Sequence, residues 1–113
     1  MKAYTDLEQS KKLTKILSLD SADMYWKNGV SYKYIQCFTP FVIDEDVNNV
    51  NFDYDVPCWS LTALLNVLPS ATLDSSDDHH YRLHCMERYT EWYDNPIDAC
   101  VAMIERLHEQ KLL

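Results

Sequence analysis

The segment NPIDACVAMIERLHEQKLL, residues 95–113, decides the fold because it is the clearest amphipathic helix in the chain. Asn95 suits the cap before a helix, and Pro96 suits the first helical position. The apolar residues recur every three or four positions, as one buried helix face requires, at Ile97, Cys100, Val101, Ile104 and Leu107. The spacing therefore predicts a terminal helix that lays one apolar face on the core.

Cys100 raises the question of whether its thiol takes part in chemistry or fills space. It stands between Ile97 and Ile104 in the apolar face, where a thiol behaves as a small hydrophobic group. Burial among such neighbours raises the pKa of a thiol and makes it inert. We predict that Cys100 is part of the core.

Two shorter helices are predicted earlier in the chain. One helix is predicted over residues 5–17, because Thr5 and Glu8 have the spacing of a capping box and the apolar residues near its end share one face. Residues 56–69 contain Ser60, which is placed to cap a short central helix. The leucines of this second segment repeat at three and four residues: Leu61, Leu64, Leu65 and Leu68.

Three segments have strand composition. Residues 31–38 have a two-residue period with Tyr32, Tyr34 and Phe38 in one set, and their aromatic and branched content predicts a strand. A short second strand is predicted at residues 41–43. Residues 81–93 predict either a hairpin or one long bent strand, because Glu87 and Arg88 are poor residues for a tight turn. Residues 44–55 are acidic and rich in asparagine, which indicates a long loop.

The composition favours one folded unit. The chain has 113 residues, 47% of them apolar, and a single glycine, with no internal repeat and no flexible linker. We therefore predict a single α+β domain, residues 1–113. A small antiparallel sheet of three to four strands is covered by the C-terminal helix, a short central helix and an N-terminal helix.

Net charge and cysteine usage restrict the functional classes. A formal charge of −8 disfavours direct nucleic-acid binding, and no apolar run approaches the roughly 20 residues of a membrane span. The first fifteen residues lack the apolar segment of an export signal, so we expect a cytoplasmic protein whose four scattered cysteines stay reduced. We predict no cofactor, and the oligomeric state stays open.

The candidate binding residues fall into two groups. Tyr25 and Trp26 follow the first helix, and we expect them to form an exposed aromatic pair that contacts a partner. We expect Trp59 and Trp92 to pack in the core. The acidic loop provides the second group, which would attract a basic protein partner: Asp44, Glu45, Asp46, Asp53 and Asp55.

The acidic loop is also twelve residues long, and some of its oxygen-bearing side chains have the spacing of the ligands in a calcium-binding loop. Its sixth residue is Asn49 where such loops need glycine, and its twelfth is Asp55 where they use a longer glutamate. Pro40 and Pro57 disfavour the two flanking helices that a calcium loop requires. We interpret the segment as a solvated loop and predict no metal.

Histidine and cysteine offer two further sites. His79, His80, His84 and Cys85 are zinc ligand types, but strand alternation would point Cys85 away from His80 and His84, which favours exposed histidines without metal. Cys58 precedes the central helix and is the least implausible nucleophile, although no histidine is identified as its base. We predict no catalytic residue.

Three motifs resemble a known family. SADM at residues 21–24, VPCWSLTALLNVLP at 56–69 and the terminal segment at 95–113 are similar to a family of small uncharacterised proteins from gut bacteria that is associated with prophages and other mobile elements. The resemblance implies a cytosolic accessory protein of a mobile element and not a metabolic enzyme. It implies no cofactor and no catalytic residue.

Three functional hypotheses follow. The leading one is a non-enzymatic protein-interaction protein. The second is an acidic nucleic-acid mimic that inhibits a basic DNA-binding partner, which requires the carboxylates of residues 44–55 and 74–78 to share one surface. The third is a small cysteine- or metal-dependent enzyme that uses Cys58 or the histidine segment.

Overall fold

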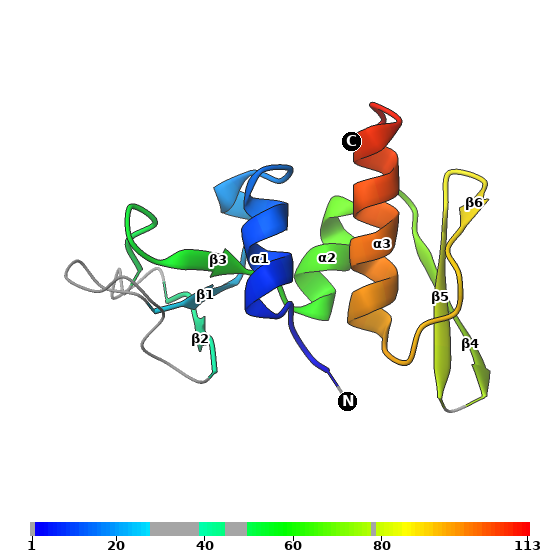
Figure 1. Ribbon diagram of the computed structural model, residues 1–113, viewed down its shortest axis with the longest axis horizontal. Helices are drawn as coiled ribbons and strands as arrows, with labels where there is room; N and C mark the ends of the chain where they lie inside the picture. The colour runs from blue at the N-terminus through cyan, green and yellow to red at the C-terminus, as the bar shows by residue number, and fades with distance from the viewer. Residues whose placement is uncertain (1, 28–38, 45–49, 78) are drawn as a thin grey trace.

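The computed structural model describes residues 2–27, 39–44, 50–77 and 79–113 and shows an α+β fold (Figure 1). In these ranges the helices are α1 (Leu7–Thr14), α2 (Leu61–Val67) and α3 (Pro96–Glu109), with a short 3₁₀ turn at Leu19–Ser21. The predicted fold class and the three helices are confirmed. None of the described helices is both long and apolar enough to cross a membrane.

The strands form two antiparallel sheets, where the sequence predicted one. The N-terminal sheet has the order β2-β1-β3, with β2 at Phe41–Val42, β1 at Met24–Trp26 and β3 at Val56–Cys58. The C-terminal sheet has the order β4-β5-β6, with β4 at Thr72–Asp77, β5 at His80–Cys85 and β6 at Arg88–Tyr89. The predicted strand at 41–43 is confirmed in β2, and the predicted strand at 31–38 lies outside the described residues.

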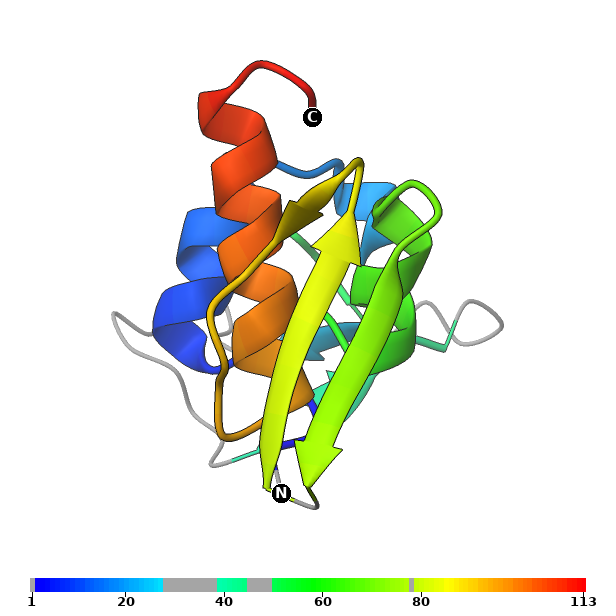
Figure 2. The same cartoon turned by 90° about the vertical axis from the view of Figure 1, so that its right-hand side faces the viewer.

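The helices lie between the two sheets, so the sheets occupy opposite ends of the molecule (Figure 1). α1 contacts β3 of the N-terminal sheet, α2 contacts α3, and α3 packs on β5. The C-terminal sheet therefore has one face on α3 and the other exposed, as the view onto it in Figure 2 shows.

The terminal helix forms as its sequence predicts. The Asn95 side chain accepts a hydrogen bond from the backbone N–H of Asp98 at 2.9 Å, and Pro96 is the first helical residue. Cys100 is fully buried in the apolar face with Ile97 and Ile104. The prediction that Cys100 fills the core is confirmed.

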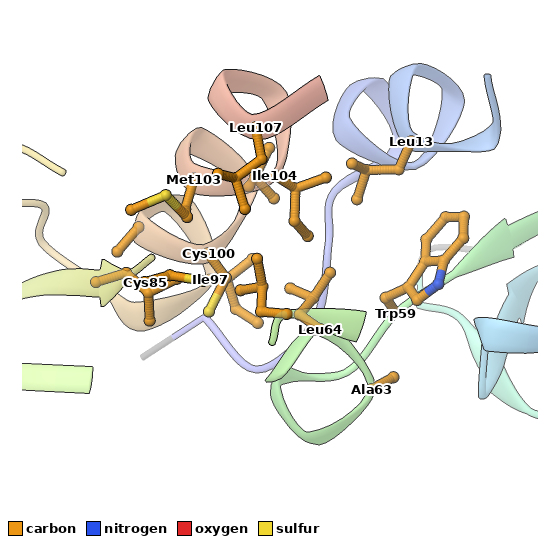
Figure 3. Close-up of a cluster of buried hydrophobic side chains, with 14 residues drawn as sticks. Leu13, Trp59, Ala63, Leu64, Cys85, Ile97, Cys100, Met103, Ile104 and Leu107 are labelled. Carbon is orange, nitrogen blue, oxygen red and sulfur yellow. The ribbon is translucent and has the colours of Figure 1, made fainter. Parts of the chain in front are cut away.

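The core joins α3 to α1, α2 and β5 (Figure 3). Its fully buried members include Leu13 of α1, Leu64 of α2 and Leu83 of β5, and Trp59 lies just before α2. The central helix begins as predicted, because the Ser60 side chain accepts from the backbone N–H of Ala63. These contacts remove most of the apolar surface of three helices from water, which is the main stabilising term.

The first helix begins one position later than its sequence suggested. The capping box uses Asp6 and Gln9 instead of Thr5 and Glu8: the Asp6 side chain accepts from the Gln9 backbone, and the Gln9 side chain accepts from the Asp6 backbone. Thr5 is fully buried and is used for tertiary contacts. Thr5 and Asp6 are both favourable cap residues, so the propensity of the sequence did not separate them.

The hairpin alternative is confirmed for residues 81–93, and its turn explains why the sequence was ambiguous. Met86 and Glu87 connect β5 to β6 with φ of 52° and 65°, so both occupy the left-handed region that a tight two-residue hairpin needs. Neither residue favours that region. The pairing of Cys85 with Arg88 and of His84 with Tyr89 holds the turn closed.

We expect Asp98 to contribute to the free energy of unfolding in a pH-dependent way. Partial burial works to raise its pKa, but hydrogen bonds from Lys2, Asn95 and Gln9 outweigh this and hold the pKa below its ordinary value of 3.8. A carboxyl group whose pKa is lower in the folded than in the unfolded protein stabilises the fold at pH values above its ordinary pKa. This stabilisation is lost as the pH falls through the pKa of the folded state.

Asp98→Asn is expected to lower the free energy of unfolding by up to about 1 kcal/mol near neutral pH, since the group is partly exposed. The difference from the wild type should shrink as the pH falls below 3.8, measured by thermal unfolding followed by circular dichroism. Asp94→Asn, at an exposed position before the same helix, is the control. A difference that stays constant with pH would contradict this role for Asp98.

Candidate functional site

The prediction that Tyr25 and Trp26 form an exposed aromatic pair is wrong. Tyr25 and Trp26 lie in β1, the middle strand of the N-terminal sheet, and only 5% and 7% of their surfaces are exposed. The Trp26 indole N–H donates to Ser10 Oγ at 3.1 Å, and the Trp26 and Tyr4 rings pack in an edge-to-face arrangement with centres 6.0 Å apart. Aromatic residues after a turn suit a buried strand as well as a surface, and burial in the sheet decides between the two.

The acidic loop is only partly a solvated surface. Asp44 and Asp53 are exposed, whereas the Asp55 side chain is 1% exposed, accepts from the Asn51 backbone at 3.0 Å and lies 3.8 Å from Lys27 Nζ. Asp55 therefore closes its own turn, and its expected place on the acidic surface is wrong. Glu45 and Asp46 lie outside the described residues, and so does part of the segment that has calcium-loop spacing.

The described carboxylates of the two acidic segments do not share one surface. Asp44 and Asp53 belong to the segments that flank β2 and β3 in the N-terminal sheet. Asp74 and Asp77 lie on β4 in the C-terminal sheet, at the other end of the molecule (Figure 1). A nucleic-acid mimic needs one continuous row of charges, so this arrangement argues against mimicry.

Cys58 lies in β3 and is fully buried. Its sulfur lies 3.4 Å from the hydroxyl and from the backbone carbonyl oxygen of Thr5, and burial raises the pKa of the thiol. Burial also raises the pKa of Cys100, to about 12, and that of Cys85. A nucleophilic thiol needs the opposite shift and a path to substrate, so these described cysteines have structural roles.

A buried polar network surrounds Thr5 and explains the position of Cys58. Thr5 Oγ1 accepts from the Trp59 backbone N–H at 3.1 Å and lies 2.7 Å from Ser10 Oγ. The Thr5 backbone N–H donates to the Trp59 carbonyl oxygen at 2.9 Å. The network joins α1 to β3 and satisfies polar groups that would otherwise be buried without partners.

The histidines follow the strand alternation that the sequence predicted. His80 and His84 of β5 have exposed or half-exposed rings, whereas Cys85 is buried and directs its thiol to the Pro69 carbonyl oxygen at 3.1 Å. His80 Nδ1 lies 3.1 Å from a carboxylate oxygen of Asp77. Within the part of the chain that the structure describes, no three histidine, cysteine or carboxylate groups gather as metal ligands.

The outer face of the C-terminal sheet carries four stacked side chains that the sequence did not single out as a set. The Arg82 guanidinium carbon lies 4.4 Å from the centre of the Tyr89 ring and 4.7 Å from that of Trp92. The His84 ring also stacks on Tyr89, with centres 4.2 Å apart and planes 6° from parallel. We call Trp92, Arg82, Tyr89 and His84 the aromatic–arginine stack.

A local irregularity turns Trp92 outward, contrary to its predicted packing in the core. Tyr89 pairs with His84 and Tyr93 with Tyr81, so the returning segment has one residue more than β5 between these pairs. Such a bulge reverses which side chains face outward. Tyr93 packs against the core, while Trp92 remains 43% exposed.

The exposed area of the stack is large for aromatic residues. Tyr89 is 48% exposed and Trp92 is 43% exposed, although each already contacts Arg82. The Arg82 side chain is held from β4 by Asp74, whose carboxylate oxygen lies 3.1 Å from Arg82 Nε. This ion pair and the two ring contacts restrain the Arg82 side chain, which reduces the entropy that it would lose on binding.

Comparison with known proteins adds no relative. No family model matches the chain, and the searches of curated proteins and of solved structures also found no match. The candidate site therefore depends on its geometry alone. In the sequence, the alternation of His80, Arg82 and His84 indicates that these residues share one face of a strand. The site can be recognised only when the following segment is known to fold back beside this strand.

Proposed function

We propose that the protein is a non-enzymatic interaction protein, and that the aromatic–arginine stack is the centre of its docking surface. The observation that carries this proposal is the large exposed area of Tyr89 and Trp92 around a fixed arginine. Tryptophan, tyrosine and arginine are the side chains that dominate binding energy at protein interfaces. A sheet face of this kind offers a partner flat apolar area at little conformational cost.

The charge around the stack indicates a basic partner. Residues 72–94 contain six carboxylates and two arginines, which gives a net charge of −4 with neutral histidines. One arginine, Arg82, is already paired with Asp74. A partner segment with lysine or arginine side chains and an apolar anchor would complement this surface and be attracted to it at low salt.

The resemblance of the sequence to proteins of mobile elements supplies the proposed context. An accessory protein of a prophage or another mobile element, in the cytoplasm, would bind a protein of its host or of the element itself. The resemblance supports this context, and the aromatic–arginine stack supports the binding mode.

The test compares capture of proteins from the native host by the wild type and by two variants. Trp92→Ala removes an exposed member of the stack, and Phe41→Ala removes a side chain of similar exposure in the N-terminal sheet. We expect one basic protein to bind the wild type and Phe41→Ala equally, and to bind Trp92→Ala at least about tenfold more weakly.

Both substitutions replace exposed side chains, so circular dichroism should show that both variants remain folded. A captured protein that binds Trp92→Ala and the wild type equally would rule out the stack as the docking surface. Capture of no protein at low salt would remove the support for an interaction function.

A further inference from the structure

A groove of about 400 Å³ lies beside the N-terminal sheet, and none of its lining residues belongs to the C-terminal sheet that carries the aromatic–arginine stack. It is formed where the end of α1 and the 3₁₀ turn meet the segment that leads into β3. Its walls include two lysines and four apolar side chains: Lys11, Lys15, Leu19, Phe52, Val56 and Pro57. Both the size and the apolar lining are within the range of small-molecule sites.

The two lysines place positive charge on the groove of an acidic protein. Lys11 lies in the last turn of α1, Lys15 is the C-cap residue four positions later, and both are exposed. Among the described residues, neither lysine has a carboxylate within 4.0 Å. Lysines at a helix end stabilise its dipole, but this role leaves their ammonium groups available to a ligand.

Asp55 is the acidic residue of the groove wall, and its charge is directed elsewhere. Its side chain is 1% exposed, with Lys27 Nζ at 3.8 Å and the Asn51 backbone N–H as partners. An anion in the groove would therefore meet Lys11 and Lys15 at the α1 side, while its apolar part would contact Phe52 and Val56.

We infer that this groove binds a small amphipathic anion, a molecule with an apolar body and one carboxylate, sulfonate or phosphate group. The complementary charge of Lys11 and Lys15 selects the anionic group, and the apolar walls select the body. The groove is independent of the proposed docking surface, so either can fail without the other.

The test uses 8-anilinonaphthalene-1-sulfonate, a fluorescent amphipathic anion, titrated into the full chain. We expect saturable binding that weakens about tenfold in the double variant Lys11→Ala/Lys15→Ala. The matched control, Lys12→Ala/Lys111→Ala, removes the same charge outside the groove and should bind like the wild type. Phe52→Ala should also weaken binding, because it removes an apolar wall.

The uncharged analogue N-phenyl-1-naphthylamine separates charge recognition from general apolar binding. It should bind the wild type and the Lys11→Ala/Lys15→Ala variant equally. Equal loss of sulfonate binding in both double variants, or no saturable binding by the wild type, would overturn the inference. Self-association of the wild type that the Lys11→Ala/Lys15→Ala variant abolishes would assign the groove to a second copy of the chain and would also overturn it.

Discussion

Trp59→Ala is expected to lower the free energy of unfolding by about 3–5 kcal/mol, the usual cost of removing a large aromatic side chain from a core. Trp59 is fully buried in the core cluster that includes Leu13 of α1 and Leu64 of α2, and its indole N–H donates to Ser21 Oγ at 2.9 Å. The substitution creates a cavity and removes this hydrogen bond. Because a domain of this size is stable by about 5–15 kcal/mol, the variant should lose a large part of its stability.

The measurement is urea unfolding followed by far-ultraviolet circular dichroism, which does not depend on tryptophan fluorescence. The matched control is Trp92→Ala, which removes the same side chain from a 43% exposed position and should cost less than about 1 kcal/mol. Similar losses in the two variants would contradict the assignment of Trp59 to the core and Trp92 to the surface.

Thr5→Val is expected to cost about 1–3 kcal/mol, although it changes the volume of the side chain very little. The hydroxyl of Thr5 is the acceptor for the backbone N–H of Trp59, at 3.1 Å in a fully buried position. Valine leaves this N–H without a partner and removes the 2.7 Å contact with Ser10 Oγ. A buried donor without an acceptor loses its hydration and gains nothing in return.

Unfolding in urea again measures the change. Thr62→Val, at an exposed position of α2, makes the same chemical change away from a buried hydrogen bond, so it is the control and should be nearly neutral. Thr5→Ser keeps the hydroxyl and should retain more stability than Thr5→Val. If valine were tolerated better than serine at this position, the methyl group and not the hydrogen bond would be the important part of Thr5.

The elements that the sequence predicted well are those whose signal is local. In α3, the cap at Asn95, the proline at the first position and the apolar spacing around Cys100 all indicate the same helix, and the structure contains it. The central helix is similar, because Ser60 provides its cap. Where capping, propensity and hydrophobic periodicity agree, a single sequence is sufficient.

The features that were missed depend on contacts between distant segments. β4 has the composition of a polar loop and becomes a strand only because β5 pairs with it, as in the pairing of Asp74 with Arg82. Trp92 turns outward because of a one-residue irregularity that no local pattern marks. Tyr25 is buried, and the centre of the Phe41 ring from the neighbouring strand β2 lies 5.6 Å from that of its own ring. Long-range pairing of this kind decides strand burial more than propensity does.

The predicted binding residues failed for the same reason, and the aromatic–arginine stack was missed as a set. Charge and aromatic content identified Asp55 and Trp26 as surface residues, but a turn and a sheet bury them. The stack brings Arg82 of β5 together with Tyr89 and Trp92 from the returning segment. Each of these residues is unremarkable alone, and only the fold places them together.

The sheet order β4-β5-β6 also has a consequence for assembly. Within the described part of the chain, no strand pairs with the outer side of β4, so its backbone groups there could template the addition of a foreign strand and start a fibre. Asp77 places negative charge on this edge strand, whereas the charge of Asp74 is balanced by Arg82. Charged side chains on an edge strand disfavour the addition of a second strand, so the charge of Asp77 would work against fibre formation at β4.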